Sequence, residues 1–536
     1  MIKHLKYLAI LLTLALTPGC TEDKPVVKEA EILKTVDIMF GVEKVETAGV
    51  STRSAAGSGL DVGFADPTRA GKDDDEVPVN DVWILQFNGA GALAATPVYI
   101  TQTGLTSSPY HGFTCYTTSA DLVAGRNTTV YIIANLDDPA RFVGSTLTLG
   151  QFEGGTLTFL TKDAIEQEAS QIMVGCFRGD IPEKGKPEPL TWVHRIAARL
   201  KLDLTYDIQI DGGDFTPETI QLQSVPTVAS YYDGQGASAW RFPSPSAANF
   251  IDYPMEAITG SGSSYIWYVT ENLRGINSAV GHQWYKYRAN EPDYAANGNV
   301  SYGTRIVMKG TYYKAVSTGT MPEGRSVVTV TIYPGMNETT DYNIRRNHSY
   351  DMQANITTLL NGTDMRVEVE TGPVVRYTYY YENGDTETLF ATDFDANVAT
   401  GTYTPTDAWI NKYHADIPDK GNNFGPGVAT PSSLNITADS ENTVKVLYPT
   451  APGTVGYTIT YHPNGASVGQ ATSFNVPAGG EHHLVPVFIL GFSRPGWVFF
   501  GWNIVPDGSG FGYTGAETIT MNSDIDLYAV WSMESR

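Results

Sequence analysis

The sequence is poor in several features on which common protein classes depend. It has only three cysteines in 536 residues, so disulfide bonds do not hold the fold together. It has 35 Lys and Arg against 58 Asp and Glu, and this net charge of −23 argues against binding to nucleic acid or to anionic lipid. No hydrophobic run reaches the length that spans a membrane. Cys115 and Cys176 either pair with each other or are two small buried residues, and the sequence leaves both alternatives open.

The sequence also lacks the motifs of common enzymes. No HExxH, CxxC pair, phosphate-binding loop or GxSxG elbow occurs, and the nine histidines are scattered. Asp385, Asp393 and Asp395 form one conceivable carboxylate cluster, but aspartates are common in the turns of β proteins. The adjacent His482 and His483 would face opposite sides of a strand, which makes them poor joint metal ligands. We therefore predict that the chain is not an enzyme and has no catalytic residue, no metal site and no cofactor.

What the sequence does contain favours strands. It is 42% hydrophobic and has 31 Tyr, 53 Gly and 30 Pro, a composition typical of many short strands joined by turns. Its length predicts about three to five domains. The predicted fold class is all-β.

The N-terminus resembles a bacterial lipoprotein signal. Lys3 and Lys6 form a basic start, residues 7–16 are apolar, and Cys20 follows a short stretch that includes Gly19. The resemblance implies that residues 1–20 are a signal peptide, that Cys20 is lipidated, and that residues 21–30 are a tether. Ordinary secretion without a lipid is the alternative.

A single strand and a long connection follow the tether. Residues 31–45 alternate at Val36, Ile38 and Phe40, which predicts a strand with one buried face. Residues 46–80 are rich in Gly, Ser, Ala and Asp and predict a flexible, cleavable linker. Arg53 and Arg69 within it are candidate protease sites or simply exposed arginines.

The next 290 or so residues predict two sandwiches, a count that follows from the strand signals and the usual size of such domains. The first covers 31–211 and the second 212–371. The strands we predict for the first, after its opening strand, are 82–87, 98–101, 129–134, 146–149, 172–176 and 200–206; those of the second are 220–224, 265–269, 305–309, 327–333 and 350–356.

Several stretches of these sandwiches resemble the fimbrillin family, the subunits of bacterial type V pili. The most specific is the order IYPGMNxTxDYNIRRNHxYxM within residues 325–356, two strands joined by a polar connection. The stretches 81–87, 130–135, 194–199 and 268–272 follow the family's order as well. The resemblance implies transthyretin-like or immunoglobulin-like sandwiches, partner subunits that exchange strands, and cleavage after Arg53 or Arg69 by a trypsin-like protease.

Two small modules are predicted at the C-terminal end. Residues 372–452 look weakly like the mucin-binding-protein type of β-grasp module. Residues 453–533 resemble the internalin-type B repeat of bacterial surface proteins, through the motifs at 457–461, 494–496, 500–502, 507–510 and 527–531. Both are expected to be β-grasp-like.

Aromatic residues of these modules are candidates for ligand contact. Tyr379, Tyr380, Tyr381 and Trp497 offer rigid contact area, although each is also a candidate core residue. Strand alternation requires at least one ring of the tyrosine run to point outward. Trp502 we assign to the core.

These observations predict a cell-surface fimbrial subunit, acting as a tip or accessory adhesin assembled by donor-strand exchange. The expected location is the outer membrane, through the lipid on Cys20, and the surface fimbria. The expected partners are other fimbrillin subunits and a host or bacterial surface protein or glycan. The alternative is a stand-alone surface lipoprotein that binds a host protein or glycan without polymerising. The modules after residue 371 hinder donation of a strand from 365–370, which favours the tip.

Overall fold

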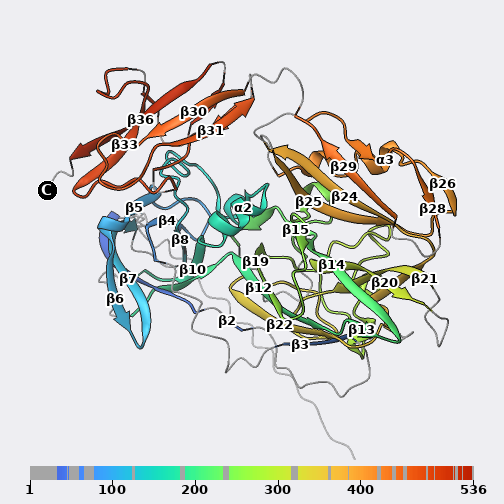
Figure 1. Ribbon diagram of the computed structural model, residues 1–536. Coiled ribbons are helices and arrows are strands. Elements are labelled where there is room, and N and C mark those ends of the chain that lie inside the picture. The colour runs from blue at the N-terminus through green and yellow to red at the C-terminus, as the bar shows by residue number, and fades with distance from the viewer. Residues whose placement is uncertain are drawn as a thin grey trace, which may run out of the picture.

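The computed structural model of the chain is built almost entirely of strands (Figure 1). It describes residues 33–44, 46–47, 60–64, 78–123, 127–181, 188–232, 241–315, 324–359, 364–383, 386–418, 424–437, 442–450, 456–477, 481–487, 489–510, 512–513, 517–521 and 523–533. The predicted all-β fold is confirmed. In this part of the chain, no helix has the length and apolar character needed to cross a membrane.

The first sandwich is one eight-stranded sheet that folds over on itself. Its strand order is β5-β4-β8-β10-β11-β1-β7-β6. Side chains of β1, β4 and β8 share one buried cluster, so the two halves of the sheet face each other across a common core. The strands are β1 (Leu33–Val42), β4 (Asp81–Phe87), β5 (Val98–Thr101), β6 (Thr106–Tyr110), β7 (Phe113–Val123), β8 (Thr128–Ala134), β10 (Met173–Gly179) and β11 (Thr191–Arg195).

β4 is buried on both faces, which explains its continuous apolar sequence. Val82 and Ile84 face the core that contains β1, whereas Trp83 and Leu85 face a second and larger core. Neighbouring residues of a strand point to opposite faces, so the alternate side chains of this one strand pack into two different cores. The prediction of a strand at 82–87 is confirmed.

The predicted strand 146–149 is wrong. Residues 146–148 belong to no strand, and helix α1 (Leu149–Glu153) begins directly after them. The Thr148 hydroxyl accepts a hydrogen bond from the backbone N–H of Gln151, and the Gln151 side chain accepts one from the backbone N–H of Thr148. This reciprocal cap fixes a helix start at a sequence that also suits a strand. A second helix, α2 (Lys162–Ala164), continues into the π-helical turn η3 (Ile165–Ala169).

The second sandwich consists of two sheets around the larger core. One sheet has the order β19-β12-β22, and β2 and β3 both pair with β22. The other has the order β13-β14-β20-β21-β23, with β18 beside β14. The strands are β2 (Glu46–Thr47), β3 (Leu60–Phe64), β12 (Ala197–Tyr206), β13 (Gln209–Ile210), β14 (Gly213–Gln223), β18 (Glu256–Ala257), β19 (Ser263–Thr270), β20 (Arg305–Lys314), β21 (Gly324–Ile332), β22 (His348–Ile356) and β23 (Val367–Thr371).

Several short elements complete the two sandwiches. Two small ladders join β9 (Thr156–Thr158) to β16 (Val228–Ser230) and β15 (Val225–Pro226) to β17 (Phe250–Ile251). One of them, the β9–β16 ladder, joins a segment of the first sandwich to a segment of the second. Single 3₁₀ turns are η2 (Gln102–Gly104), η4 (Ala247–Asn249), η5 (Gln283–Tyr285) and η6 (Arg288–Asn290).

The prediction that residues 200–206 complete the first sandwich is wrong. They lie in β12, whose neighbours β19 and β22 both belong to the second sandwich. The polar residues Asp211 and Gly212, which suggested the end of a domain, form the turn between β13 and β14. Both have positive φ, 53° and 79°, as a tight hairpin turn requires. A turn signal in the sequence therefore does not distinguish a hairpin from a domain boundary.

Part of the segment 46–80, predicted to be a flexible linker, is instead built into the second sandwich. β2 and β3 both pair with β22. Leu60 and Val62 are buried in the larger core. The sequence of β3 alternates apolar residues with Asp61 and Gly63, the pattern of a half-buried strand. The prediction for these residues is wrong because β22 supplies the partner that the segment itself lacks.

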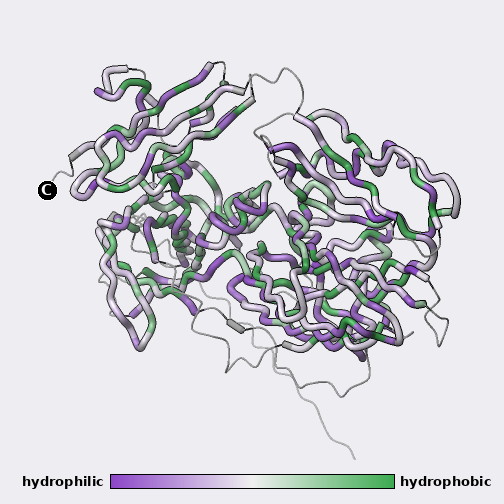
Figure 2. Tube along the Cα trace, viewed as in Figure 1, coloured by the Kyte–Doolittle hydropathy of each residue, from purple (hydrophilic) through white to green (hydrophobic). Residues whose placement is uncertain are grey.

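The two C-terminal modules share one topology. In each, a hairpin is joined by a later strand that runs parallel to the first strand of the hairpin: β29 beside β24, and β36 beside β30. The sheet orders are β25-β24-β29-β27 and β31-β30-β36-β33-β34. The predicted β-grasp-like arrangement is confirmed. Figure 2 shows hydrophobic and hydrophilic residues interspersed along the strands of both modules, and in β29 buried and half-buried residues alternate, as expected for a thin module with one buried face.

The elements of the two modules have the following bounds. The first contains β24 (Val375–Asn383), β25 (Thr386–Asp395), β26 (Gly401–Tyr403), α3 (Asp407–Ile410), η7 (His414–Asp416), β27 (Val428–Thr430), β28 (Leu434–Ile436) and β29 (Asn442–Tyr448). The second contains β30 (Gly456–His462), β31 (Thr472–Pro477), β32 (Glu481–His483), β33 (Trp497–Asn503), β34 (Gly512–Tyr513), β35 (Thr518–Thr520) and β36 (Ile525–Met533).

Candidate functional site

The strand β1 lies inside its sheet rather than at an edge. It pairs antiparallel with β7 from Leu33 to Gly41 and in parallel with β11 over residues 40–42. These two neighbours come from much later in the chain. Removal of β1 would leave unpaired backbone groups on both of them, which a strand from elsewhere can satisfy.

One face of β1 is apolar and buried. Val36, Ile38 and Phe40 point into the core of the first sandwich, and Phe40 has no exposed surface. The Phe40 ring stacks on Tyr116 of β7, with 5.8 Å between the ring centroids. On the opposite face the Ser119 hydroxyl donates a hydrogen bond to the exposed Asp37. Burial of the apolar side chains therefore holds the strand, and the polar face adds little.

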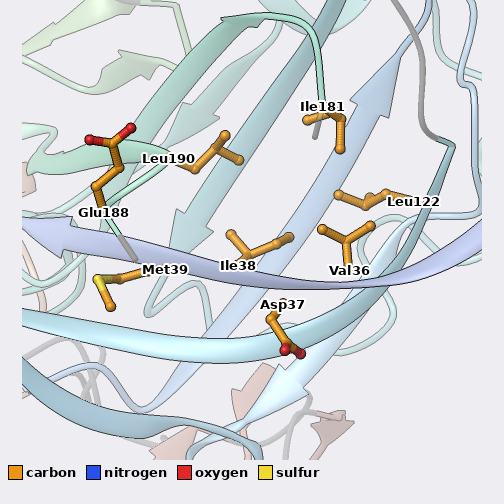
Figure 3. A pocket seen from close by; sticks show the side chains of 8 residues that line it. All are labelled: Val36, Asp37, Ile38, Met39, Leu122, Ile181, Glu188 and Leu190. Carbon is orange, nitrogen blue, oxygen red and sulfur yellow. The ribbon is translucent and has the colours of Figure 1, made fainter. Parts of the chain in front are cut away.

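A small cavity lies beside the buried face of β1. Its volume is about 20 Å³, and it is lined by Val36, Asp37, Ile38, Met39, Leu122, Ile181, Glu188 and Leu190. Figure 3 shows Val36 and Ile38 on one side of the strand, toward Leu122 and Ile181, and Asp37 on the other side. The strand thus fills its groove incompletely at this end.

The other end of β1 is closely covered. Gly41 lies opposite Trp192 of β11, and a methyl group built at Gly41 would overlap the six-membered ring of Trp192. The edge of Phe113 contacts the same indole, with 5.0 Å between ring centroids. No sequence pattern indicates a role for Gly41 or Trp192, because their contact exists only where β1 and β11 lie side by side.

The strand β3 is held by buried polar side chains. Arg366 donates a 2.6 Å hydrogen bond to the carbonyl of Leu60 and pairs with the buried Asp364 at 2.7 Å. The Gln283 side chain accepts the backbone N–H of Val62 at 3.1 Å. These backbone contacts add to the burial of Leu60 and Val62 in holding β3 against β22.

The segment 365–370, from which donation of a strand is predicted to be hindered, largely coincides with an edge strand of the second sandwich. β23 pairs with β21, Val367 opposite Val330 and Thr371 opposite Ser326. Val367 and Val369 contact the larger core, whereas the glutamates between and after them are exposed.

The module that follows β23 is joined to the second sandwich by charge. Asp393 is buried and accepts hydrogen bonds from Lys309 of β20 at 2.8 Å, from Lys412 at 2.6 Å and from the Tyr413 hydroxyl at 2.8 Å. Burial by itself would raise the pKa of Asp393, but the lysines outweigh burial and hold the pKa below its ordinary value. Arg376 and Glu218 form a second ion pair between the same two units.

The polar residues of the stretch that resembles fimbrillins are structural. Glu271 and Arg346 have no exposed surface and form an ion pair of 2.9 Å. Lys286 donates to the carbonyls of Asn337 and Pro334, and burial lowers its pKa to about 7. Burial of these charged groups is offset by their ion pair and by hydrogen bonds to backbone carbonyls, so they have a structural role in the core.

The predicted cleavage and lipidation residues Cys20, Arg53 and Arg69 lie outside the described residues. The acidic residue Asp385, one of the three aspartates considered as a cluster, lies outside them as well. Asp395 accepts a hydrogen bond from Tyr403. Within the described part of the chain no three His, Cys, Asp or Glu side chains are grouped to hold a metal ion. Cys115 and Cys176 are both free thiols, so they do not pair.

The candidate aromatic residues differ widely in exposure. Tyr379 is fully buried and Tyr381 nearly so, and both belong to the core of their module. Neither is available to a ligand in this fold. Tyr380 is half-buried, with the Lys445 ammonium 5.1 Å from its ring centroid. Trp497 is also half-buried, and the Arg494 guanidinium lies 3.8 Å above it.

One exposed aromatic residue, Phe500, was not predicted from the sequence. Phe500 is 78% exposed, because a bulge between Phe499 and Gly501 turns it out of the β33 ladder. Trp502, two residues later, is buried as predicted. The doubled phenylalanine before a glycine is a weak sequence signal for such a bulge.

Two segments of the chain match known families. Residues 267–354 match a domain of unknown function, DUF4906. Residues 457–530 match the Listeria-Bacteroides repeat domain, which confirms the predicted repeat. None of the curated proteins matches the chain.

Solved structures of fimbrial proteins are similar to this chain. The tip fimbrial protein Mfa3 of Porphyromonas gingivalis, C-terminally truncated, is 11% identical with a TM-score of 0.34, over 68% of this chain and 100% of that one. The fimbrillin FimA of the same species is 12% identical with a TM-score of 0.33, over 60% and 96%. A fimbrial assembly protein of Parabacteroides distasonis is 9% identical with a TM-score of 0.31, over 68% and 100%.

The chain is therefore an all-β protein with fimbrial proteins among its structural neighbours and a C-terminal Listeria-Bacteroides repeat domain.

Proposed function

We propose that this chain is a cell-surface fimbrial subunit that receives a strand from a neighbouring subunit and acts at the tip of the fimbria or as an accessory adhesin. The observation that carries the proposal is the position of β1. The first strand of the chain occupies the middle of a sheet between β7 and β11 and is held mainly by its apolar face.

The proposed mechanism is replacement of β1 by an equivalent strand. A cut after Arg53 or Arg69 would separate β1 from the body, so that β1 leaves and a partner's strand enters between β7 and β11. Main-chain hydrogen bonds to both neighbours would supply affinity, and the pockets for alternate side chains would supply specificity. The sequence resemblance to fimbrillins supports this mechanism.

The two candidate cleavage sites predict different products. β3 lies between them, so a cut after Arg53 leaves β3 on β22, whereas a cut after Arg69 separates β3 from the body as well as β1. N-terminal sequencing of the chain from purified fimbriae distinguishes a start at Ser54 from one at Ala70. A chain in assembled fimbriae that still starts at Cys20 would contradict strand exchange.

Lipidation of Cys20 would attach the precursor to the outer membrane before assembly. Cells that express the chain should incorporate labelled palmitate into it, and Cys20→Ala should abolish the incorporation. Incorporation that persists in Cys20→Ala would show that the lipid is elsewhere.

The tip position is supported by the surroundings of β23. β23 is followed at once by a module that is joined to the second sandwich through Asp393 and Arg376. To donate β23, the chain would have to break these ion pairs and insert a strand that still carries folded modules. Immunogold labelling against residues 371–536 should mark the ends of fimbriae. Labelling along the whole shaft would contradict the tip position.

The alternative remains a surface lipoprotein that binds a host protein or glycan without polymerising. The observation that favours it is the exposed ring of Phe500 in the last module, an aromatic contact surface that does not require a partner subunit. Deletion of the gene would then reduce adhesion without a change in fimbriae seen by electron microscopy.

A further inference from the structure

We propose that the β1 groove selects its incoming strand at two positions: it requires glycine where Gly41 lies, and it prefers an aliphatic side chain larger than valine where Val36 lies. The occupant is an extended segment of a different subunit with this spacing. The inference rests on the proposed strand exchange and names the chemistry of the partner.

The glycine requirement follows from Trp192. The six-membered ring of the indole lies across the position of a Cβ atom at Gly41, and the Phe113 ring packs against the same indole with 5.0 Å between ring centroids. The backbone of Trp192 is closely packed as well, since a methyl group built at Gly175 of β10 would come within 2.5 Å of the Trp192 carbonyl oxygen. The half-buried ring can therefore make room for a side chain only by disturbing its contact with Phe113. Any side chain at this position of an incoming strand must displace it, and overpacking of this kind weakens association by about tenfold or more.

The preference at the other position follows from the cavity. The void of about 20 Å³ beside Val36 and Ile38 has room for roughly one methyl group. Leu122, Ile181 and Leu190 supply an apolar lining. An isoleucine in place of Val36 would add one methylene beside this apolar part of the lining, which Glu188 borders. One additional buried methylene strengthens association by about fourfold.

This chain's own β23 fits the groove less well than β1 does. Val367, Val369 and Gly372 have the same spacing as Val36, Ile38 and Gly41. The residues that would take the places of Ile38 and Phe40, however, are the smaller Val369 and Thr371. Phe40 is fully buried, so a threonine there would leave a large void. A second copy of this chain is therefore not the favoured donor, and the proposal commits to a different subunit.

The first test uses the intact chain. Gly41→Ala should increase hydrogen exchange at the β7 amides about tenfold, and the increase should disappear in a Trp192→Ala background. Val36→Ile should slow the same exchange. Additive effects of Gly41→Ala and Trp192→Ala would overturn the glycine requirement, and this result does not depend on whether strands are exchanged.

The second test uses the full chain nicked by trypsin and three fluorescent peptides. These are residues 33–42 in their natural sequence, the Val36→Ile peptide and the Gly41→Ala peptide. The Val36→Ile peptide should bind about fourfold more tightly than the natural one and the Gly41→Ala peptide at least about tenfold more weakly. Trp192→Ala protein should bind the natural and Gly41→Ala peptides equally.

The outcomes separate the two proposals. Equal binding of all three peptides to the natural protein overturns the selection rule but leaves strand exchange standing. Binding of none of them, together with a non-additive result in the intact chain, overturns strand exchange, and the partner preference with it. Preference in the stated order supports both.

Discussion

Substitution of Phe40 by alanine is expected to loosen β1 more than any other single change on its buried face. Phe40 has no exposed surface, and its ring stacks on Tyr116. Phe to Ala substitutions in protein cores cost about 3 to 5 kcal/mol. Tyr116 is only half-buried and can move partly into the void, so we expect a value near the lower limit. About 3 kcal/mol corresponds to a roughly 150-fold increase in the opening of the strand.

Hydrogen exchange measures this opening locally. A chain with several folding units has no single free energy of unfolding, so a global melting curve would not isolate β1. Backbone amides of β7 and β11 that pair with β1 should exchange about 100-fold faster in Phe40→Ala. Amides of β14 and β20 in the second sandwich should not change. Phe40→Leu keeps most of the side-chain volume, so it should lower the free energy that holds β1 in place by less than about 1.5 kcal/mol.

Thr35→Ala is the matched control on the opposite face. Thr35 is exposed and donates one hydrogen bond to Asp121, which at an exposed site contributes little. If Phe40→Ala and Thr35→Ala increase exchange in β7 equally, β1 is not held by its apolar face. The groove would then lack the apolar selectivity on which strand exchange depends.

Three further predictions concern the other units. Asp393→Asn should destabilise the first C-terminal module by about 1 to 3 kcal/mol, measured by urea unfolding followed by protein fluorescence. The pKa of the Asp393 carboxyl is depressed in the folded state, so its stabilising effect is complete above the ordinary pKa of about 3.9 and is lost as pH falls through the folded pKa. The difference in stability between the variant and the natural protein should therefore be equal at pH 7 and pH 5 and shrink below pH 4. Arg366→Met leaves Asp364 and the Leu60 carbonyl without this partner and should accelerate hydrogen exchange in 60–64 at least tenfold, with no change in β1. Trp502→Ala should unfold the last module alone, because loss of this buried indole costs about 3 to 5 kcal/mol of folding free energy, which approaches the whole stability of a module of this size. Limited proteolysis should then leave a stable fragment that ends near residue 450.

Much of the fold could be predicted from local alternation. The alternation of Val36, Ile38 and Phe40 predicted a strand with one buried face, and the continuous apolar run 82–87 predicted a strand. Both patterns arise because a strand that buries one face alternates apolar and polar residues, whereas a strand that buries both faces is apolar throughout. The C-terminal repeat could be predicted because its turns and aromatic residues recur at fixed spacing, and Trp502 is buried where that spacing places it.

The candidate site could not be predicted in the same way, because its contacts join distant parts of the chain. Arg366 and Leu60 are separated by 306 positions, and no periodicity links them. Gly41 gains its role only from Trp192, which lies on a strand whose pairing with β1 is parallel and remote in sequence. Tyr379 and Tyr381 were considered as ligand contacts because tyrosine suits both surfaces and cores, and only the packing of their module decides between the two.

Under the proposed strand exchange, the position of β1 makes a protease cut, rather than a rearrangement of the intact chain, the expected trigger. While β1 is covalently attached, it competes for its groove at an effective concentration that reaches about the millimolar range for flexible connections. A free partner strand at micromolar concentration would therefore need about a thousandfold advantage in affinity, whereas the cavity beside Val36 offers only about fourfold. Once the connection is cut, β1 loses the advantage of attachment and is diluted after it leaves. The modest advantage of a better-fitting strand then suffices to determine which strand the groove retains.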